Sequence, residues 1–159
     1  MGRGRALRLV VTHLLTREQY VAKPLTDVFD FFARAENLAH LTPPWLHLVI
    51  LTPSPIAMAE GACLDYRVRV LGMRLRWTSR IALYQPPREF IDEQIRGPYA
   101  LWRHRHIFAA QGEGVLVRDE VTYALPCGFL GRIAQKIYVQ GALRAVFNYR
   151  EKMIRELLG

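Results

Sequence analysis

Hydrophobic and polar residues alternate along most of the chain between residues 47 and 125, a pattern typical of half-buried β-strands. Pro and Gly residues divide this region into six alternating segments, at residues 47–51, 62–71, 73–83, 89–96, 100–108 and 114–125. Another candidate strand, near residues 9–20, precedes them. We therefore predict an antiparallel meander of about seven strands.

Helical spacing replaces this alternation in two regions. Behind Pro24, apolar residues at helical intervals predict a first short helix: Val28, Phe31, Phe32 and Ala35. Asn37 is then suited to be the N-cap of a second short helix, which Pro43 and Pro44 end.

The last 30 or so residues predict a long amphipathic helix. Residues 129–138 and the residues after them place their apolar side chains on different arcs, so we expect a bend or a change of packing near Gly141. Arg150 is unexpected because it lies near the middle of the second apolar stripe, which contains Val139, Ala142, Leu143, Val146, Phe147, Met153, Ile154 and Leu157.

The segment WRHRHIF, residues 102–108, places His104 and His106 on the same strand face as Trp102 and Phe108. The next strand brings Asp119 to this face. A two-residue turn at 112–113 would set Asp119 opposite His106, and a six-residue loop would set it opposite His104. In both registers a carboxylate meets a histidine on the apolar side.

The preceding hairpin has two possible registers. A two-residue turn at Gly97 and Pro98 would pair Asp92 with Arg103 on the outer face. A three-residue loop through Tyr99 would instead turn Phe90, Asp92 and Gln94 inward and set Asp92 opposite His104. The residues alone leave both registers open.

Charged groups in an apolar environment need partners or water, so these residues must either neutralise one another or line a cavity. Simpler structural roles exist for each: His104 and His106 would form hydrogen bonds to Asp119, and Arg150 would reach solvent or pair with Asp119 or Asp92. Metal binding by the two histidines and Asp119 lacks a strong ligand spacing, so we expect no metal. The sequence has no nucleophile motif, phosphate loop or dinucleotide fingerprint, so we expect no cofactor.

The composition is that of a globular protein: 159 residues, 51% hydrophobic and 23% charged. No apolar run approaches the roughly 20 residues of a membrane helix. Arg8 interrupts the signal-like N-terminus, so we expect residues 1–8 to be a basic extension, residues 9–159 to be one domain, and the location to be cytoplasmic. We expect Cys63 and Cys127 to be buried thiols.

The net charge of +8 comes largely from arginine. With Leu71 and Gly72 as the turn of the central hairpin, Tyr66 opposes Trp77 and Val68 opposes Leu75 on the core face. The outer face then carries Arg67, Arg69, Arg74, Arg76 and Arg80. An anionic surface partner would relieve their repulsion, although Asp65 and water would do so in part. Nucleic acid is less favoured because no aromatic RNA-binding motif accompanies the arginines.

Three segments carry a resemblance to a known superfamily: PLTDVFDFFARAENLAHLTPPW, FIDEQIRGPYALWRHRHIF and DEVTYALPCGFLGRI. In this order they resemble the START-like or SRPBCC (Bet v 1-like) superfamily, in its polyketide cyclase/dehydrase branch, over residues 13–158. The resemblance implies an α+β helix-grip fold, in which a curved seven-stranded sheet surrounds the C-terminal helix with a deep apolar cavity between them. It favours the inward register of Asp92 and Gln94. No catalytic role transfers to a named residue.

We therefore expect a protein that binds or transports a hydrophobic small molecule of lipid, polyketide or aromatic type. Apolar walls would provide affinity, and the ionisable groups would orient a polar or anionic end. The candidate contacts are Tyr66, Trp77, Asp92, Gln94, Trp102, His104, His106, Asp119, Tyr123, Phe147 and Arg150. The alternative is a cyclase or dehydratase in which His104 or His106, held by Asp119, moves protons while Arg150 stabilises an oxyanion.

Overall fold

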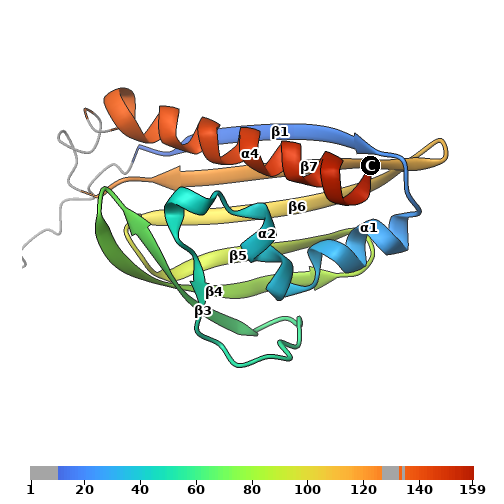
Figure 1. Cartoon of the computed structure of the whole chain (residues 1–159), viewed down its shortest axis with the longest axis horizontal. Helices are drawn as coiled ribbons and strands as arrows, with labels where there is room; N and C mark the ends of the chain where they lie inside the picture. Colours follow the sequence, from blue (N-terminus) through green and yellow to red (C-terminus); the bar gives the residue numbers. More distant parts are fainter. Residues whose placement is uncertain (1–10, 127–132, 134) are drawn as a thin grey trace, which may run out of the picture.

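The computed structural model describes residues 11–126, 133 and 135–159. Seven antiparallel strands form one curved sheet in the order β1-β7-β6-β5-β4-β3-β2 (Figure 1). The strands are β1 (His13–Val21), β2 (Val49–Ile50), β3 (Cys63–Val70), β4 (Met73–Gln85), β5 (Glu89–Arg96), β6 (Leu101–Gln111) and β7 (Gly114–Ala124). The predicted meander is confirmed, with β1 closing on β7.

The helices lie over one face of this sheet. The short ones follow β1: α1 (Leu25–Phe32), η1 (Ala35–Asn37), α2 (Leu38–Leu41) and η2 (Pro44–Leu46). The long helix α4 (Gln140–Leu158) follows a π-helical segment, η3 (Gln135–Val139), and crosses β1 and β7 (Figure 1). Because α1 contacts β6 and β7 while α2 contacts α4, the helices and the sheet enclose one core, and the predicted helix-grip fold is confirmed.

Helix α1 packs through a stripe that differs slightly from the predicted one. Val28, Phe29 and Phe32 are its buried residues, and Phe31 is only half-buried. Asn37 directly precedes α2 as predicted, but its side chain does not cap the helix. Its Nδ2 donates instead to the Phe31 carbonyl, which joins the end of α1 to the start of α2.

The hairpin registers determine which side chains face the core. Leu71 and Gly72 both have positive φ, 51° and 78°, as a two-residue type I′ turn requires. This turn sets Tyr66 opposite Trp77 on the core face and Arg67 opposite Arg76 on the outer face, as predicted. The turn at 112–113 sets His106 opposite Asp119, which is the first of the two predicted registers. Asp92 lies opposite His104, so β5 has its inward register.

One prediction about burial is wrong. Cys63 is exposed, because side chains alternate along β3 and its neighbour Leu64 takes the buried position.

Some of the predictions concern segments outside the described residues. These are Cys127, the basic extension 1–8, the predicted start of the first strand, and residues 129–132 and 134 of the predicted helix. The π-helical segment η3 ends at Val139, directly before α4, and the bend or change of packing expected near Gly141 stays a prediction. None of the helices among the described residues has the length and apolar character needed to cross a bilayer.

Candidate functional site

A layer of polar side chains divides the core beneath α4. It consists of Asp92, His104, His106, Asp119 and Arg150, and we call it the polar layer. Four of its members are less than a tenth exposed: His104, His106, Asp119 and Arg150. The Asp92 side chain is 19% exposed. Sequence reasoning proposed all five residues, and the structure brings them into contact.

The polar layer lies between two hydrophobic clusters. Along β7, Asp119 separates Val117 of one cluster from Val121 of the other. On α4, Arg150 lies between Phe147 and Ile154, which belong to the same two clusters. The same transition occurs on β7 and α4, so the layer crosses the core from the sheet to the helix.

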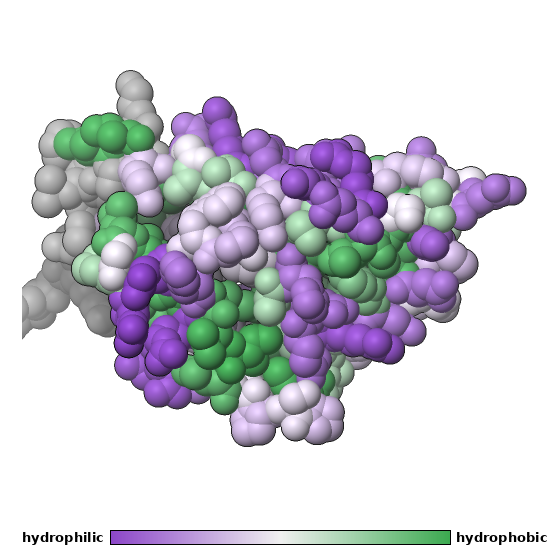
Figure 2. All heavy atoms as spheres, viewed as in Figure 1, coloured by the Kyte–Doolittle hydropathy of each residue, from purple (hydrophilic) through white to green (hydrophobic). Residues whose placement is uncertain are grey.

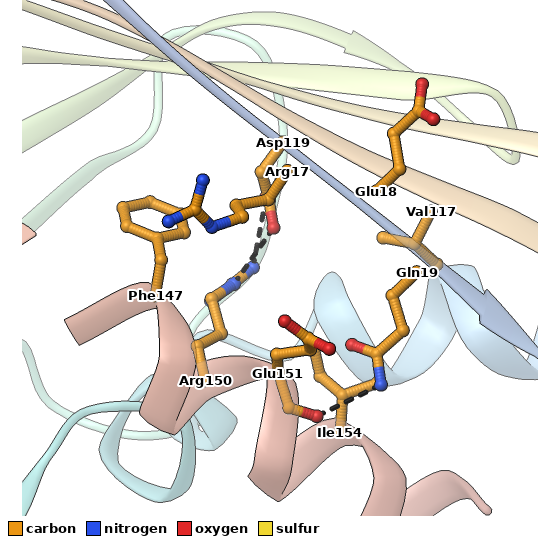
Figure 3. A pocket seen from close by; sticks show the side chains of 9 residues that line it. All are labelled: Arg17, Glu18, Gln19, Val117, Asp119, Phe147, Arg150, Glu151 and Ile154. Carbon is orange, nitrogen blue, oxygen red and sulfur yellow. Dashed lines mark hydrogen bonds and ion pairs between the residues drawn. The ribbon is translucent and has the colours of Figure 1, made fainter. Parts of the chain in front are cut away.

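Asp119 is the centre of this arrangement. Its Oδ1 lies 2.8 Å from His104 Nε2 and 3.0 Å from His106 Nδ1. Its Oδ2 accepts a hydrogen bond from Arg150 Nε at 3.2 Å (Figure 3). One carboxylate therefore holds both imidazoles and the guanidinium, which also stacks over the Phe32 ring with its Cζ 5.1 Å from the ring centre.

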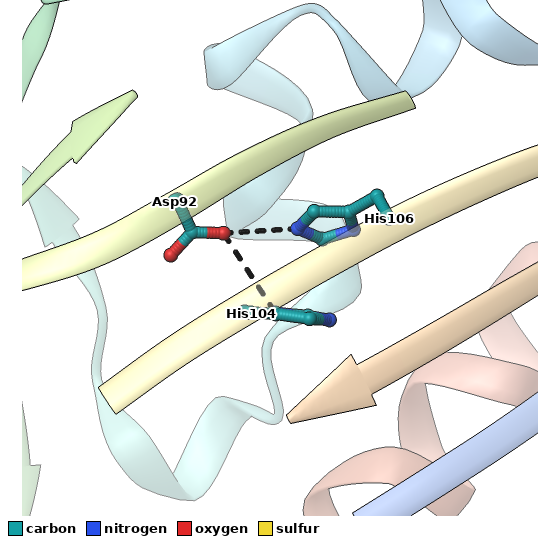
Figure 4. A group of neighbouring side chains, drawn as sticks. All are labelled: Asp92, His104 and His106. Atoms are coloured by element: carbon teal, nitrogen blue, oxygen red, sulfur yellow. Dashed lines mark hydrogen bonds and ion pairs between the residues drawn. The ribbon is translucent and has the colours of Figure 1, made fainter. Parts of the chain in front are cut away.

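Asp92 approaches the histidines from the opposite side. Its Oδ2 lies 2.9 Å from His106 Nε2 and 3.8 Å from His104 Nδ1 (Figure 4). The two imidazole rings are adjacent, with centroids 3.7 Å apart, and Phe90 stacks on His106 at 4.2 Å. Each imidazole is thus positioned between two carboxylates.

Burial and the neighbouring charges move the pKa values in the layer. Burial alone would lower the pKa of His106, but its hydrogen bonds to Asp119 and Asp92 outweigh burial and raise it. Burial and the charge of His106 lower the pKa of His104. Although burial opposes ionisation of Asp119, the Arg150 charge and the histidine hydrogen bonds hold its pKa well below the usual range. Burial likewise opposes ionisation of Asp92, but the His106 hydrogen bond and the nearby positive charges outweigh it and lower the pKa of that carboxyl.

The contacts place acidic and basic groups against one another throughout the layer. The carboxylates of Asp92 and Asp119 face both imidazoles, and Asp119 also faces the guanidinium of Arg150. Of the two possibilities that the sequence left open, paired ionisable groups or a cavity, the structure has paired groups.

The hollow at this layer is small. It opens between β1 and α4, is bounded by Arg17, Gln19, Asp119, Phe147 and Arg150 among others, and has a volume of about 10 Å³ (Figure 3). That is close to the least that holds one water molecule. The deep cavity implied by the resemblance is therefore not open beside Arg150, because paired polar side chains fill the space.

Aromatic side chains gather on the η3 side of the layer. Trp102 lies within 6.2 Å, centroid to centroid, of Trp77, Tyr99 and Tyr123. Tyr66 stacks on Trp77 at 5.9 Å, and both reach Ser79 Oγ, which accepts a hydrogen bond from Trp77 Nε1. Sequence reasoning named four of these aromatic residues but missed Tyr99 and Ser79. The inward register of the β5–β6 hairpin was the signal that would have found Tyr99.

Gln94 occupies the predicted face but contacts the chain itself. Its Nε2 donates to the Tyr99 carbonyl at 2.8 Å, and its Oε1 accepts from the Tyr99 backbone N–H at 3.2 Å. Both ends of the amide are thereby used to hold the β5–β6 loop. This loop in turn carries Tyr99 into the aromatic group.

A second hollow lies on the surface beside the β3–β4 hairpin. It has a volume of about 190 Å³ and is lined by His47, Val49, Arg67, Val68, Arg69 and Arg74; we call it the basic groove. Figure 2 shows hydrophilic residues gathered over this hairpin, at the left of the view. Within the described residues, Arg67, Arg69 and Arg74 form no ion pair, whereas Arg76 pairs with Asp65 at 2.6 Å.

Comparison with known proteins agrees with this architecture. Norcoclaurine synthase from Thalictrum flavum, solved in complex with dopamine and hydroxybenzaldehyde, has a TM-score of 0.67 at 18% identity, covering 100% of this chain and 96% of that one. Major latex-like protein 151 from Panax ginseng has a TM-score of 0.67 at 10% identity, covering 92% and 97%. The protein TTHA0849 from Thermus thermophilus has a TM-score of 0.64 at 17% identity, covering 92% and 100%.

At these identities the three structures establish a shared Bet v 1-like fold. A comparison with curated protein sequences finds no match. Residues 21–147 match a family described as polyketide cyclase / dehydrase and lipid transport. Since this match spans most of the chain and the fold agrees with it, the chain belongs to the polyketide cyclase/dehydrase and lipid transport family of the SRPBCC superfamily.

Proposed function

We propose that this protein binds a hydrophobic small molecule with a polar or anionic end between α4 and the sheet. The observation that carries the proposal is Arg150, a cation buried on the core-facing side of α4, where it pairs with Asp119 and lies over the Phe32 ring. An anionic end would replace Asp119 as the partner of Arg150. The aromatic side chains would provide apolar contact area for the rest of the molecule.

Binding requires the closed core to open. A hollow of about 10 Å³ holds no organic ligand, so side chains of α4 must move away from the sheet. The aromatic side chains beside the polar layer favour a planar aromatic or polyketide skeleton. Two phenols there stay protonated and can donate hydrogen bonds, because burial raises the pKa of both Tyr66 and Tyr99.

A pair of isosteric probes tests this proposal. In a titration, 2-naphthoate, which carries a carboxylate, should bind to saturation and should bind more tightly than the neutral 2-naphthamide. In Arg150→Met the preference should fall by about 10- to 150-fold, since a charge-assisted hydrogen bond contributes roughly 1.5–3 kcal/mol. Arg144→Met, on the exposed side of α4, should keep it. Equal binding of both probes by the wild-type chain would contradict an anionic-end site.

A second candidate function is proton transfer on a bound ketone, as in a cyclase or dehydratase. The observation in its favour is the position of each imidazole between Asp92 and Asp119, beside a guanidinium suited to an oxyanion. Norcoclaurine synthase, a structural neighbour, is an enzyme by name. The test is exchange of the α-protons of 2-tetralone in D₂O, followed by NMR. An enzyme should accelerate exchange and lose the acceleration in His106→Gln while 2-naphthoate still binds. A carrier should show no acceleration.

We also propose that the basic groove contacts an anionic lipid surface. Leu71 and Met73 at the tip of the hairpin are 67% and 59% exposed, beside Arg69 and Arg74, and such a mixture suits the interface of an anionic bilayer. Phosphatidylserine vesicles should sediment the protein, and phosphatidylcholine vesicles should not. Added salt or Arg69→Gln with Arg74→Gln should reduce sedimentation, whereas Arg144→Gln should not. Equal sedimentation by both vesicles would contradict this contact.

The cytoplasmic location and the single domain remain predictions.

A further inference from the structure

Three potential metal ligands converge between β5 and β6. One ligand atom from each of Asp92, His104 and His106 lies within 4.8 Å of the other two. Asp92 Oδ2 is 3.8 Å from His104 Nδ1 and 2.9 Å from His106 Nε2 (Figure 4). Ligand atoms bound tetrahedrally at about 2.0–2.1 Å from a zinc ion lie about 3.3 Å apart. The two separations from Asp92 Oδ2 bracket this value, and the ligand atoms of the two histidines lie no more than 4.8 Å apart, so side-chain movements would complete the coordination.

The opposite edges of the two imidazoles are held as metal-bound histidines usually are. A histidine that binds a metal through one nitrogen commonly donates its other N–H to a carboxylate. Asp119 Oδ1 lies 2.8 Å from His104 Nε2 and 3.0 Å from His106 Nδ1, in position to accept a hydrogen bond from each, and Arg150 Nη2 lies 3.4 Å from the same His106 nitrogen. These contacts direct His104 Nδ1 and His106 Nε2 toward Asp92. Arg150 holds the other oxygen of Asp119 at 3.2 Å.

We propose that Asp92, His104 and His106 form a binding site for one first-row divalent transition metal ion, with Asp119 as the carboxylate that orients both histidines. Two imidazoles and a carboxylate are a ligand set that zinc and ferrous iron accept. This inference goes beyond the proposed function and does not depend on it, because the metal contacts β5 and β6 whether or not an organic molecule lies beneath α4.

The first experiment uses the full chain without a histidine tag, freed of metal by a chelator and titrated with Co²⁺ and then Zn²⁺. We expect one Co²⁺ per chain, with visible absorption bands that Zn²⁺ abolishes by displacement. In NMR spectra, Zn²⁺ should shift the imidazole resonances of His104 and His106. Shifts confined to His13, His40 and His47, the other three histidines of the chain, would overturn the proposal.

Variants separate this site from adventitious binding. His106→Gln and Asp92→Asn should abolish the cobalt spectrum, and Asp119→Asn should weaken affinity by about 10–100-fold, the range for lost outer-shell partners. His40→Gln removes an exposed histidine and should change nothing. Unaltered affinity in folded His106→Gln, checked by circular dichroism, would overturn the proposal. If His106→Gln does not fold, the NMR shifts of the wild-type chain decide whether the metal binds at His104 and His106 or at the other histidines.

Discussion

Replacing Arg150 with Met leaves an unbranched, mostly apolar side chain on α4 but removes the cation that pairs with Asp119. Asp119 then loses contacts to Arg150 Nε at 3.2 Å and to Nη2 at 3.5 Å. It keeps both histidine contacts to Oδ1. A buried carboxylate is thus left without its guanidinium partner, so the variant should be strongly destabilised.

The size of the effect follows from burial. Removing one partner of a buried ion pair lowers the free energy of unfolding by about 3–5 kcal/mol. Since the imidazoles still hold Asp119, we expect a decrease of about 3 kcal/mol for Arg150→Met. For a chain of this length that lowers the melting temperature by about 6–12 °C. Arg155→Met is the matched control on the same helix. It breaks an exposed pair with Glu151 four residues away and should cost about 0.3–0.5 kcal/mol.

The assay is urea unfolding followed by tryptophan fluorescence and circular dichroism, with a chelator present. Arg150→Met should lower the free energy of unfolding with an unchanged denaturant slope. Adding Asp119→Asn removes the uncompensated carboxylate, so the double variant should lose at least about 1 kcal/mol less than the sum of the two single variants. If Arg150→Met matches Arg155→Met, or if the effects add, Arg150 does not hold a buried charge pair and our interpretation of the layer fails.

Three further predictions concern other parts of the sheet. Leu71→Asn should raise the free energy of unfolding by about 0.5–1 kcal/mol, because Asn tolerates the left-handed backbone of the β3–β4 turn better than Leu; an unchanged midpoint of urea unfolding would refute this. Ser79→Ala should lower the free energy of unfolding by about 1–3 kcal/mol, because Trp77 Nε1 loses its buried acceptor. A decrease of less than about 0.5 kcal/mol would indicate that Trp77 Nε1 has another partner. Hydrogen bonds from Thr78 and then Arg76 lower the pKa of Asp65, so Thr78→Val should raise the pKa of that carboxyl toward its ordinary value in an NMR titration; no change would refute the cause.

Alternation was sufficient to predict the strands and, where the turn was unambiguous, the faces of their residues. The segment predicted at 89–96 coincides with β5, and the Leu71–Gly72 turn fixed the pairing of β3 with β4. The same rule, applied to Cys63, would have placed it outside, since Leu64 must face the core. That error came from the general tendency of cysteine to be buried, which the strand period overrides.

The site needed information that a single sequence does not contain. The two loops possible at residues 97–99 differ by one residue, and that difference moves Asp92 from the outer face to a position opposite His104. The sequence analysis therefore considered Asp119, and not Asp92, as the third residue beside the two histidines, and only the inward register brings Asp92 to them. Whether the core is hollow depends on rotamers: Arg150 pairs with Asp119 beneath α4 and leaves about 10 Å³.

Native mass spectrometry of freshly purified protein, with chemical identification of anything released, tests the central claim most directly. Our account predicts one non-covalent organic adduct per chain, with an apolar skeleton and an acidic group, and a reduced adduct in Arg150→Met but not in Arg144→Met. A bare chain, which also fails to take up apolar acids offered in excess, would contradict the claim that the closed core opens to receive a ligand.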